Sequence, residues 1–155
     1  MGAVRPGQGT PLPPANFPVM DSTESLIRRY YEAFNRGDRE AMLALLAEDV
    51  AHDVNQGPRE TGKAAFREFL GHMDRCYRET IRDLVVMVDG TGTRAAAEFV
   101  VEGEYLATDA GLPEARGQRY SLPAGAFLAL AEGRIARVTT YYNLQDWIRQ
   151  VGGGG

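Results

Sequence analysis

The sequence holds one cysteine, one lysine and two histidines among its 155 residues. A single cysteine, Cys76, excludes an intrachain disulfide, and we expect it to be a small buried residue on a helix. Metal sites need several converging ligands, so the scarcity of histidine and cysteine predicts no zinc site. Because Lys63 is the only lysine and the arginines are scattered, the chain has no basic block that would bind nucleic acid or an anionic membrane.

Long apolar runs and phosphate-binding motifs are also missing. No segment reaches the roughly 18 apolar residues of a membrane span. The start of the chain, where Arg5 precedes Pro and Gly, lacks the apolar stretch of a secretory signal, so we expect a cytoplasmic protein. Neither a Gly-x-Gly-x-x-Gly pattern, nor a P-loop, nor a Gly-x-Ser-x-Gly elbow occurs. We therefore predict that the protein uses no cofactor.

What is present fits one folded domain with two tails. The hydrophobic fraction of 44% is enough for a core in a chain of this length. Residues 1–20 are rich in Pro and Gly and show no periodicity, which predicts a flexible tail, with Met20 as an alternative start. We assign residues 21–151 to a single domain and residues 152–155 to a flexible glycine tail.

Helical spacing dominates the first half of this domain. Asp21 and Ser22 are good helix caps, and the first predicted helix stops at residues 35–37, where Gly37 suits a left-handed cap. Asp38 caps a short second helix. A third helix is predicted from about Gly62 to Cys76, with His72 on its solvated side.

A period of two replaces the helical spacing after the third helix. Strands are predicted at residues 81–88, 94–108, 118–130 and 135–143, followed by a short helix at 144–151. Together with a short strand at 50–54, this order predicts an α+β fold with helices on one face of a curved, mainly antiparallel sheet. Gly103 and Gly125 interrupt long strands and suggest bulges or bends, so we expect the bent sheet to enclose a pocket.

The stretch from Val50 to Gly62 is the first candidate for chemistry. Asp53 and His52 stand side by side among apolar residues, and an apolar setting destabilises the charged form of a carboxylate and makes it a better base. Strict alternation puts His52 on one face of the strand and Asp53 on the other. Asp53, His52 or neither can therefore face the pocket, and His52 is a competent alternative base because it titrates near neutrality.

Three segments resemble a known family. They are residues 29–38, the stretch 50–62 just described, and residues 117–127 with 141–147. The chain resembles the ketosteroid isomerase-related, SnoaL-like branch of the nuclear transport factor 2-like superfamily. The resemblance implies a cone-shaped domain with about three N-terminal helices on a curved sheet.

The resemblance also implies residue roles. In ketosteroid isomerases an Asp base works with an oxyanion hole of Tyr and a protonated Asp, whose pKa is raised by its apolar surroundings. Asp53 matches the base and Tyr30 the tyrosine donor. The position of the second donor, measured from Pro123 and Phe127, falls on Gly125, which cannot donate a side-chain hydrogen bond. A lost oxyanion donor costs about 2.7–4 kcal/mol, which argues against efficient steroid isomerisation.

The expected function is a cofactor-free proton transfer on a small apolar carbonyl compound, as in a steroid delta-isomerase. The alternatives are a non-catalytic binding domain for an apolar small molecule, which Gly125 favours, and a hydrolase or cyclase on the same fold. The resemblance implies a homodimer through the exposed sheet face. We expect these residues to line the pocket: Asn55, Phe66, Phe99, Tyr105, Tyr120, Gly125, Phe127, Tyr142 and Trp147.

Overall fold

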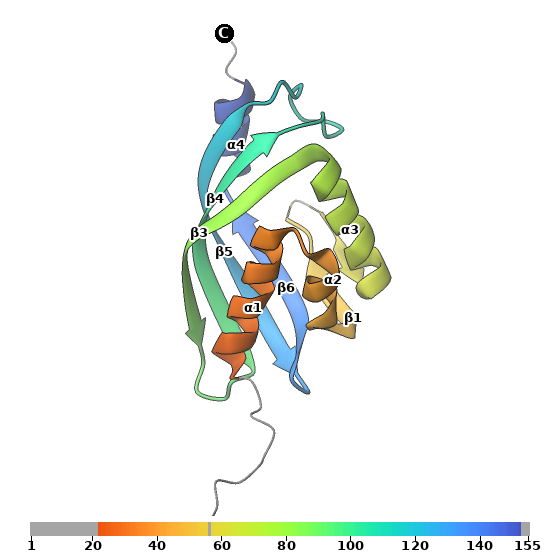
Figure 1. Cartoon of the computed structure of the whole chain (residues 1–155), viewed down its shortest axis with the longest axis vertical. Helices are drawn as coiled ribbons and strands as arrows, with labels where there is room; N and C mark the ends of the chain where they lie inside the picture. Colours follow the sequence, from red (N-terminus) through yellow and green to blue (C-terminus); the bar gives the residue numbers. More distant parts are fainter. Residues whose placement is uncertain (1–21, 56, 153–155) are drawn as a thin grey trace, which may run out of the picture.

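The computed structural model describes residues 22–55 and 57–152, which form four helices and one six-stranded sheet (Figure 1). The helices are α1 (Thr23–Arg36), α2 (Arg39–Ala44), α3 (Lys63–Cys76) and α4 (Leu144–Gly152). The strands are β1 (Leu46–Asp53), β2 (Arg59–Thr61), β3 (Tyr77–Val88), β4 (Arg94–Tyr105), β5 (Arg119–Ala131) and β6 (Arg134–Tyr142). The predicted tails lie outside the described residues, except for Gly152, which ends α4.

The strands follow the order β2-β1-β6-β5-β4-β3 in one curved sheet. Neighbouring strands are antiparallel, apart from β1 and β6, which run parallel. Figure 1 shows α1, α2 and α3 on one side of the sheet and α4 over its end. The predicted α+β class, with helices covering one face of a curved sheet, is confirmed.

Helix α1 begins and ends where its caps predict. The Ser22 side chain accepts a hydrogen bond from the backbone N–H of Ser25, and Gly37 adopts a left-handed conformation with φ of 71°. Leu26, Ile27 and neighbouring aromatic residues on the same face are buried against the sheet. This apolar stripe fixes the side of α1 that faces the interior.

Strand β3 begins four residues earlier than predicted. Its first residues alternate between the two faces of the sheet, with Tyr77, Glu79 and Ile81 paired to the inward positions of β4. Arg78 lies between the first two of these residues and Arg82 follows Ile81, and these charges hide the two-residue repeat. Because α3 ends at Cys76, no residue separates the helix from the strand.

The glycines on β4 and β5 do not form the predicted bulges. The β4–β5 ladder runs through Gly103 and Gly125 without a shift of register, whereas β3 shifts register between Arg82 and Val85. Gly103 instead makes room for a ring, because a Cβ there would lie 2.3 Å from the Tyr120 side chain. The missing side chain lets Tyr120 lie flat over β4 and reach β3.

The core has two parts. The larger one joins α1, α2 and α3 to the sheet, and the smaller one joins α4 to the other end through Tyr105, Tyr120, Leu122, Trp147 and Val151. The chain therefore holds the two ends of the sheet with separate sets of contacts. None of the described helices has the length and apolar character needed to span a membrane.

Candidate functional site

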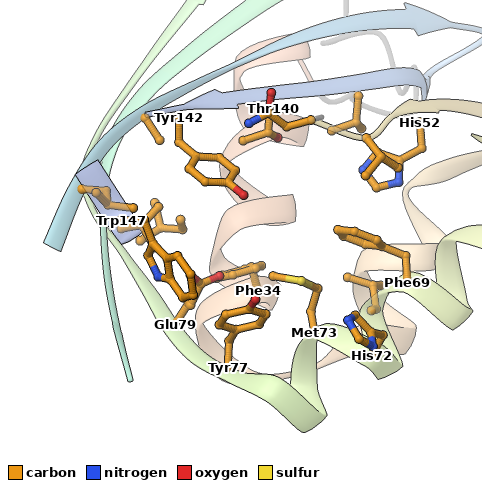
Figure 2. A pocket seen from close by; sticks show the side chains of 18 of the residues that line it. Phe34, His52, Phe69, His72, Met73, Tyr77, Glu79, Thr140, Tyr142 and Trp147 are labelled. Carbon is orange, nitrogen blue, oxygen red and sulfur yellow. The ribbon is translucent and has the colours of Figure 1, made fainter. Parts of the chain in front are cut away.

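A cavity of about 520 Å³ lies between the inner face of the sheet and the helices. Its volume falls in the range of small-molecule sites, and its walls are mainly aromatic and apolar. Figure 2 shows the side chains that extend into it from several elements. Its polar and titratable lining residues include Tyr30, His52, Asn55, His72, Tyr77, Glu79, Asp109, Thr140 and Tyr142.

Both His52 and Asp53 border this cavity, but strand β1 turns the His52 ring into it and the Asp53 carboxylate toward other partners. Val50 and His52 share the inward face and are 0% and 6% exposed. The parallel pairing of His52 with Val138, whose side chain also lines the cavity, fixes this orientation. Of the three alternatives that the sequence left open, Asp53, His52 or neither, the side-chain geometry favours His52 as the pocket group (Figure 2).

The Asp53 carboxylate binds partners on the opposite face of the sheet. It accepts hydrogen bonds from Arg59 Nε at 2.5 Å, Arg137 Nε at 2.8 Å and Thr139 Oγ1 at 2.6 Å. These bonds, led by the one from Arg59, hold the pKa of the Asp53 carboxyl far below its usual range. A carboxylate so strongly stabilised in its charged form is a poor proton acceptor, so the network favours a structural role that ties β1 to β2 and β6.

His52 lies between two aromatic rings. Its ring centroid is 4.5 Å from those of Phe66 and Phe69. Burial lowers the pKa of the imidazole to about 4, against the smaller opposing effect of the Asp53 charge. The ring is therefore neutral at pH 7, and its Nδ1 atom is buried without a hydrogen-bond partner among the described residues.

Tyr30 lies on the buried face of α1, where it belongs to the larger core and also lines the cavity. Its ring meets Tyr31 edge to face at 5.1 Å. Burial raises the pKa of the Tyr30 phenol, with a smaller lowering effect from the Arg39 charge. The phenol therefore keeps its proton and can donate a hydrogen bond at neutral pH.

Glu79 is the pocket residue that the sequence reading missed. It extends from the start of β3 into the cavity, near Tyr77 and Trp147 (Figure 2). Burial raises the pKa of its carboxyl, although a hydrogen bond from Tyr120 and the Arg39 charge act in the opposite direction. The Tyr120 hydroxyl donates to Glu79 Oε2 at 2.7 Å and fixes one of the two carboxyl oxygens. The signal was the period-two repeat Tyr77, Glu79, Ile81, which places a carboxyl on an inward face.

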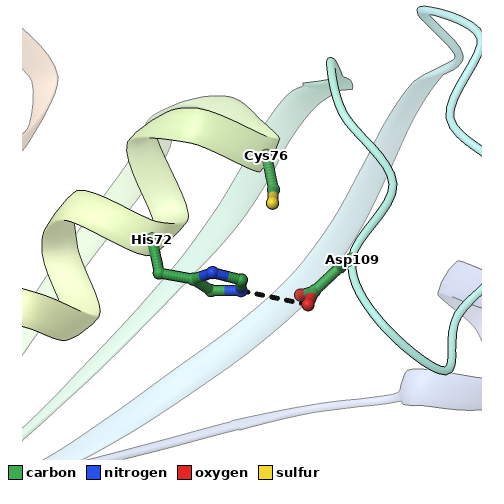
Figure 3. Close-up of side chains that lie close together, drawn as sticks. All are labelled: His72, Cys76 and Asp109. Atoms are coloured by element: carbon green, nitrogen blue, oxygen red, sulfur yellow. Dashed lines mark hydrogen bonds and ion pairs between the residues drawn. The ribbon is translucent and has the colours of Figure 1, made fainter.

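A cluster of hydrogen-bonded polar side chains, His72, Tyr77 and Asp109, lies at the rim of the cavity. His72 Nε2 lies 3.0 Å from Asp109 Oδ1, and the Tyr77 hydroxyl donates to Asp109 Oδ2 at 2.7 Å. His72 is thus not simply solvated, as the sequence predicted, because it joins α3 to the loop after β4. Cys76 is buried one turn further along α3, where desolvation raises the pKa of its thiol (Figure 3).

The structure bears out some of the remaining pocket predictions and not others. Asn55, Phe66, Phe99, Tyr142 and Trp147 line the cavity. Tyr105 and Tyr120 are not lining residues, because their side chains fill the smaller core beside α4.

Gly125 and Phe127 lie on the outer face of the sheet. Strand alternation turns Ala124 and Ala126 inward in their place: Ala124 lines the cavity and Ala126 belongs to the core. Gly125 pairs with Glu98 and Tyr141. A side chain at position 125 would not reach the pocket, so a glycine there removes no donor from it. The argument for a pocket without chemistry, which was based on Gly125, therefore has no structural support.

An α+β domain with helices on a curved, open six-stranded sheet is consistent with the nuclear transport factor 2-like fold, and solved structures with that fold match this one. Residues 27–138 match the SnoaL-like domain. The chain belongs to the SnoaL-like domain family.

Solved structures of related proteins agree with this assignment. A "putative polyketide cyclase" from Pseudomonas putida KT2440 is 59% identical, with a TM-score of 0.83, and the match covers 84% of this chain and 98% of that one. A second protein of the same description, from Xanthomonas campestris pv. campestris, is 60% identical with a TM-score of 0.81 over 83% and 96% of the two chains. A "putative ketosteroid isomerase" from Kribbella flavida DSM 17836 is 28% identical with a TM-score of 0.55 over 79% and 78%. No protein of curated function matches the chain.

The Asp53 network predicts the outcome of Asp53→Asn. If Asp53 were the general base, the variant would lose turnover without losing stability. The ion pairs predict instead that the variant loses about 1–3 kcal/mol of unfolding free energy, measured by denaturant titration at pH 7. The loss should shrink as the pH falls, because the low folded-state pKa adds stability above the unfolded pKa of 3.8 and this stability disappears as Asp53 is protonated. Asp49→Asn, an exposed change on the same strand, is the control; equal stability of the two variants would contradict the network.

The burial of His52 predicts its titration. Proton NMR of the two histidine rings should show one midpoint at about pH 4, which His72→Asn assigns to His52 by removing the other signal. The unfolded chain binds this proton below about pH 6.5 and the folded protein only below about pH 4. The His52 contribution to unfolding free energy therefore rises as pH increases through that window. A His52 midpoint near 6.5 would show that the ring is solvated.

Proposed function

We propose that this protein is a cofactor-free enzyme that moves a proton on a small apolar carbonyl compound, as an isomerase or a cyclase. The observation that supports this proposal is Glu79, a carboxyl of raised pKa on the wall of an aromatic cavity. A carboxyl whose pKa moves toward the working pH can both accept and return a proton. Two of the similar structures, one described as a polyketide cyclase and one described as a ketosteroid isomerase, support this class of reaction.

The reaction needs a base, and Glu79 is the proposed one. As a carboxylate it takes a proton from the carbon next to the substrate carbonyl, and the C–H electron pair forms the enolate. In an isomerisation the protonated Glu79 returns this proton to a different carbon. In a cyclisation the enolate carbon attacks a second carbonyl, a C–C bond forms, and the new alkoxide oxygen receives the proton. Tyr120 holds one oxygen of Glu79 and leaves the other for the substrate.

The enolate oxygen also needs a hydrogen-bond donor. Tyr142 extends into the cavity from β6 (Figure 2), and burial raises the pKa of its phenol, so the hydroxyl keeps its proton. Tyr30 offers a second phenol on α1. These hydroxyls replace the acid donor that the resemblance had placed at Gly125. His52, neutral at pH 7, is the alternative base that we retain from the sequence.

Glu79→Gln tests this assignment. The amide keeps the shape of the carboxyl but cannot accept the proton, so kcat/KM should fall by about 100-fold or more. Turnover is measured on β,γ-unsaturated cyclic ketones and on aromatic polyketones, and binding is measured with a planar naphthol. Glu68→Gln, a change at an exposed position of α3, is the matched control. Naphthol affinity should be unchanged within a few-fold in both variants. If the wild type turns over a ketone and Glu79→Gln does so equally well, Glu79 is not the base.

We further propose that a second copy of the chain covers the outer face of the sheet. Phe127 and Tyr141 are 50% and 52% exposed there, and their rings meet at 5.8 Å. Met87 adds another half-exposed apolar side chain to the same face. Exposed apolar patches of this kind mark interaction sites more often than free surface.

Phe127→Glu tests the dimer. A charge at the centre of the covered face should convert a dimer to a monomer in sedimentation velocity, without lowering helix content in circular dichroism. Leu106→Glu changes an exposed apolar residue just past the end of β4, whereas Phe127 pairs with Ala96 near its start, and this variant should leave the dimer intact. A wild-type protein that sediments as a monomer over the micromolar range would overturn the proposal.

A further inference from the structure

We propose that His72, Cys76 and Asp109 form a binding site for a divalent transition-metal ion of the zinc and cobalt type at the rim of the cavity. The ligand atoms of the three residues lie within 4.8 Å of one another (Figure 3). Few histidines and cysteines are available, and the fold brings the only cysteine and one of the two histidines to one carboxylate. The site is separate from Glu79 and does not depend on its proposed role.

Helix geometry places the first two ligands. His72 and Cys76 are four residues apart on α3, so their side chains lie on the same face, one turn apart. Ligands at this spacing can bind one ion from a rigid element. Because α3 ends at Cys76 and continues directly into β3, packing at the helix end fixes the thiol.

Two tyrosines position the third ligand. The loop after β4 returns to α3, since the backbone N–H of Leu106 donates to the carbonyl of Cys76 at 2.7 Å. The Tyr105 hydroxyl accepts a hydrogen bond from the Asp109 backbone N–H at 2.9 Å, and the Tyr77 hydroxyl donates to Asp109 Oδ2. Oδ1 is thereby directed at His72. Outer hydrogen bonds of this kind orient carboxylate ligands in metal sites.

The donor set selects the ion. A thiolate, an imidazole and a carboxylate are the three ligand types that zinc accepts, whereas magnesium and calcium prefer oxygen alone. One thiolate and one carboxylate together balance the charge of a divalent cation, which favours its transfer into a partly buried site. A simple ion pair between His72 and Asp109 would not require the thiol beside it.

Three protein ligands leave a fourth tetrahedral position. His72 and Asp109 both line the cavity, so this position faces the space where a ligand would bind. Zinc sites with three protein ligands keep the fourth position for water or substrate. The ion would therefore add an oxygen-binding point at the rim, on a different element from Glu79.

Cobalt titration of the reduced protein tests the site. Co²⁺ should bind with a stoichiometry of one and produce a sulfur-to-cobalt charge-transfer band in the near ultraviolet, which Zn²⁺ should then remove by competition. Cys76→Ser and His72→Asn should abolish the band, whereas His52→Asn should keep it. Circular dichroism of each variant shows that it is folded. In the wild type, Zn²⁺ should also shift the His72 ring signals in NMR and leave those of His52 in place.

Tyr77→Phe tests whether the hydrogen bond from Tyr77 orients Asp109 as a metal ligand. Without the Tyr77 hydroxyl, Asp109 loses one of its orienting bonds, and Co²⁺ affinity should fall by about tenfold or more. The proposal is overturned if no charge-transfer band forms, or if the band persists in His72→Asn. Neither result affects the test of Glu79 as the base, because the Glu79→Gln variant keeps all three proposed metal ligands.

Discussion

The two-residue repeat of the strands decides which side chains reach the cavity. Each long strand sends alternate residues to the inner face, and the hydrogen-bonded register between strands locks that choice. The parallel pairing of β1 with β6 determines which face of β1 turns inward. The Asp53 hydrogen bonds to Arg137 and Thr139 hold these two strands together on the outer face. With that face occupied by charge, His52 must point inward. A slip of one residue would bring Asp53 into the cavity and expose His52.

The cavity then shifts the pKa values of two of its lining residues, His52 and Glu79, in opposite directions. Burial disfavours whichever form of a group is charged, so it lowers the pKa of His52 and raises that of Glu79. Environments that shift pKa values apart are how carboxyl and imidazole groups acquire distinct roles in one site. Tyr120 limits the shift at Glu79, because its hydrogen bond stabilises the carboxylate. Gly103 makes this bond possible by leaving space for the Tyr120 ring, so a residue with no side chain helps to set the acidity of another.

The sequence predicted those parts of the structure that depend on local pattern. The caps at Ser22 and Gly37, the helix ending at Cys76 and the α+β order all follow from spacing and turn chemistry. The start of β3 was hidden, because Arg78 and Arg82 interrupt the apolar repeat that would have exposed Glu79 as an inward carboxyl. Asp53 and His52 could not be separated by alternation alone, since the face that turns inward is set by pairing with β6, which is far away in the sequence. Gly125 was misplaced for the same reason: counting from Pro123 gives a position but not a face.

The junction of α3 and β3 joins the two polar groups of the cavity in a way that no single motif records. Cys76 ends the helix, Tyr77 begins the strand, and Glu79 lies two residues further along. Tyr77 and Glu79 share the inner face, and the Tyr77 hydroxyl holds Asp109 while Glu79 meets Tyr120. A continuous helix-to-strand transition leaves no loop to absorb movement. The Tyr77–Asp109 and Glu79–Tyr120 hydrogen bonds therefore start two residues apart on the inner face of β3, so one short segment of chain holds both polar groups at this end of the cavity.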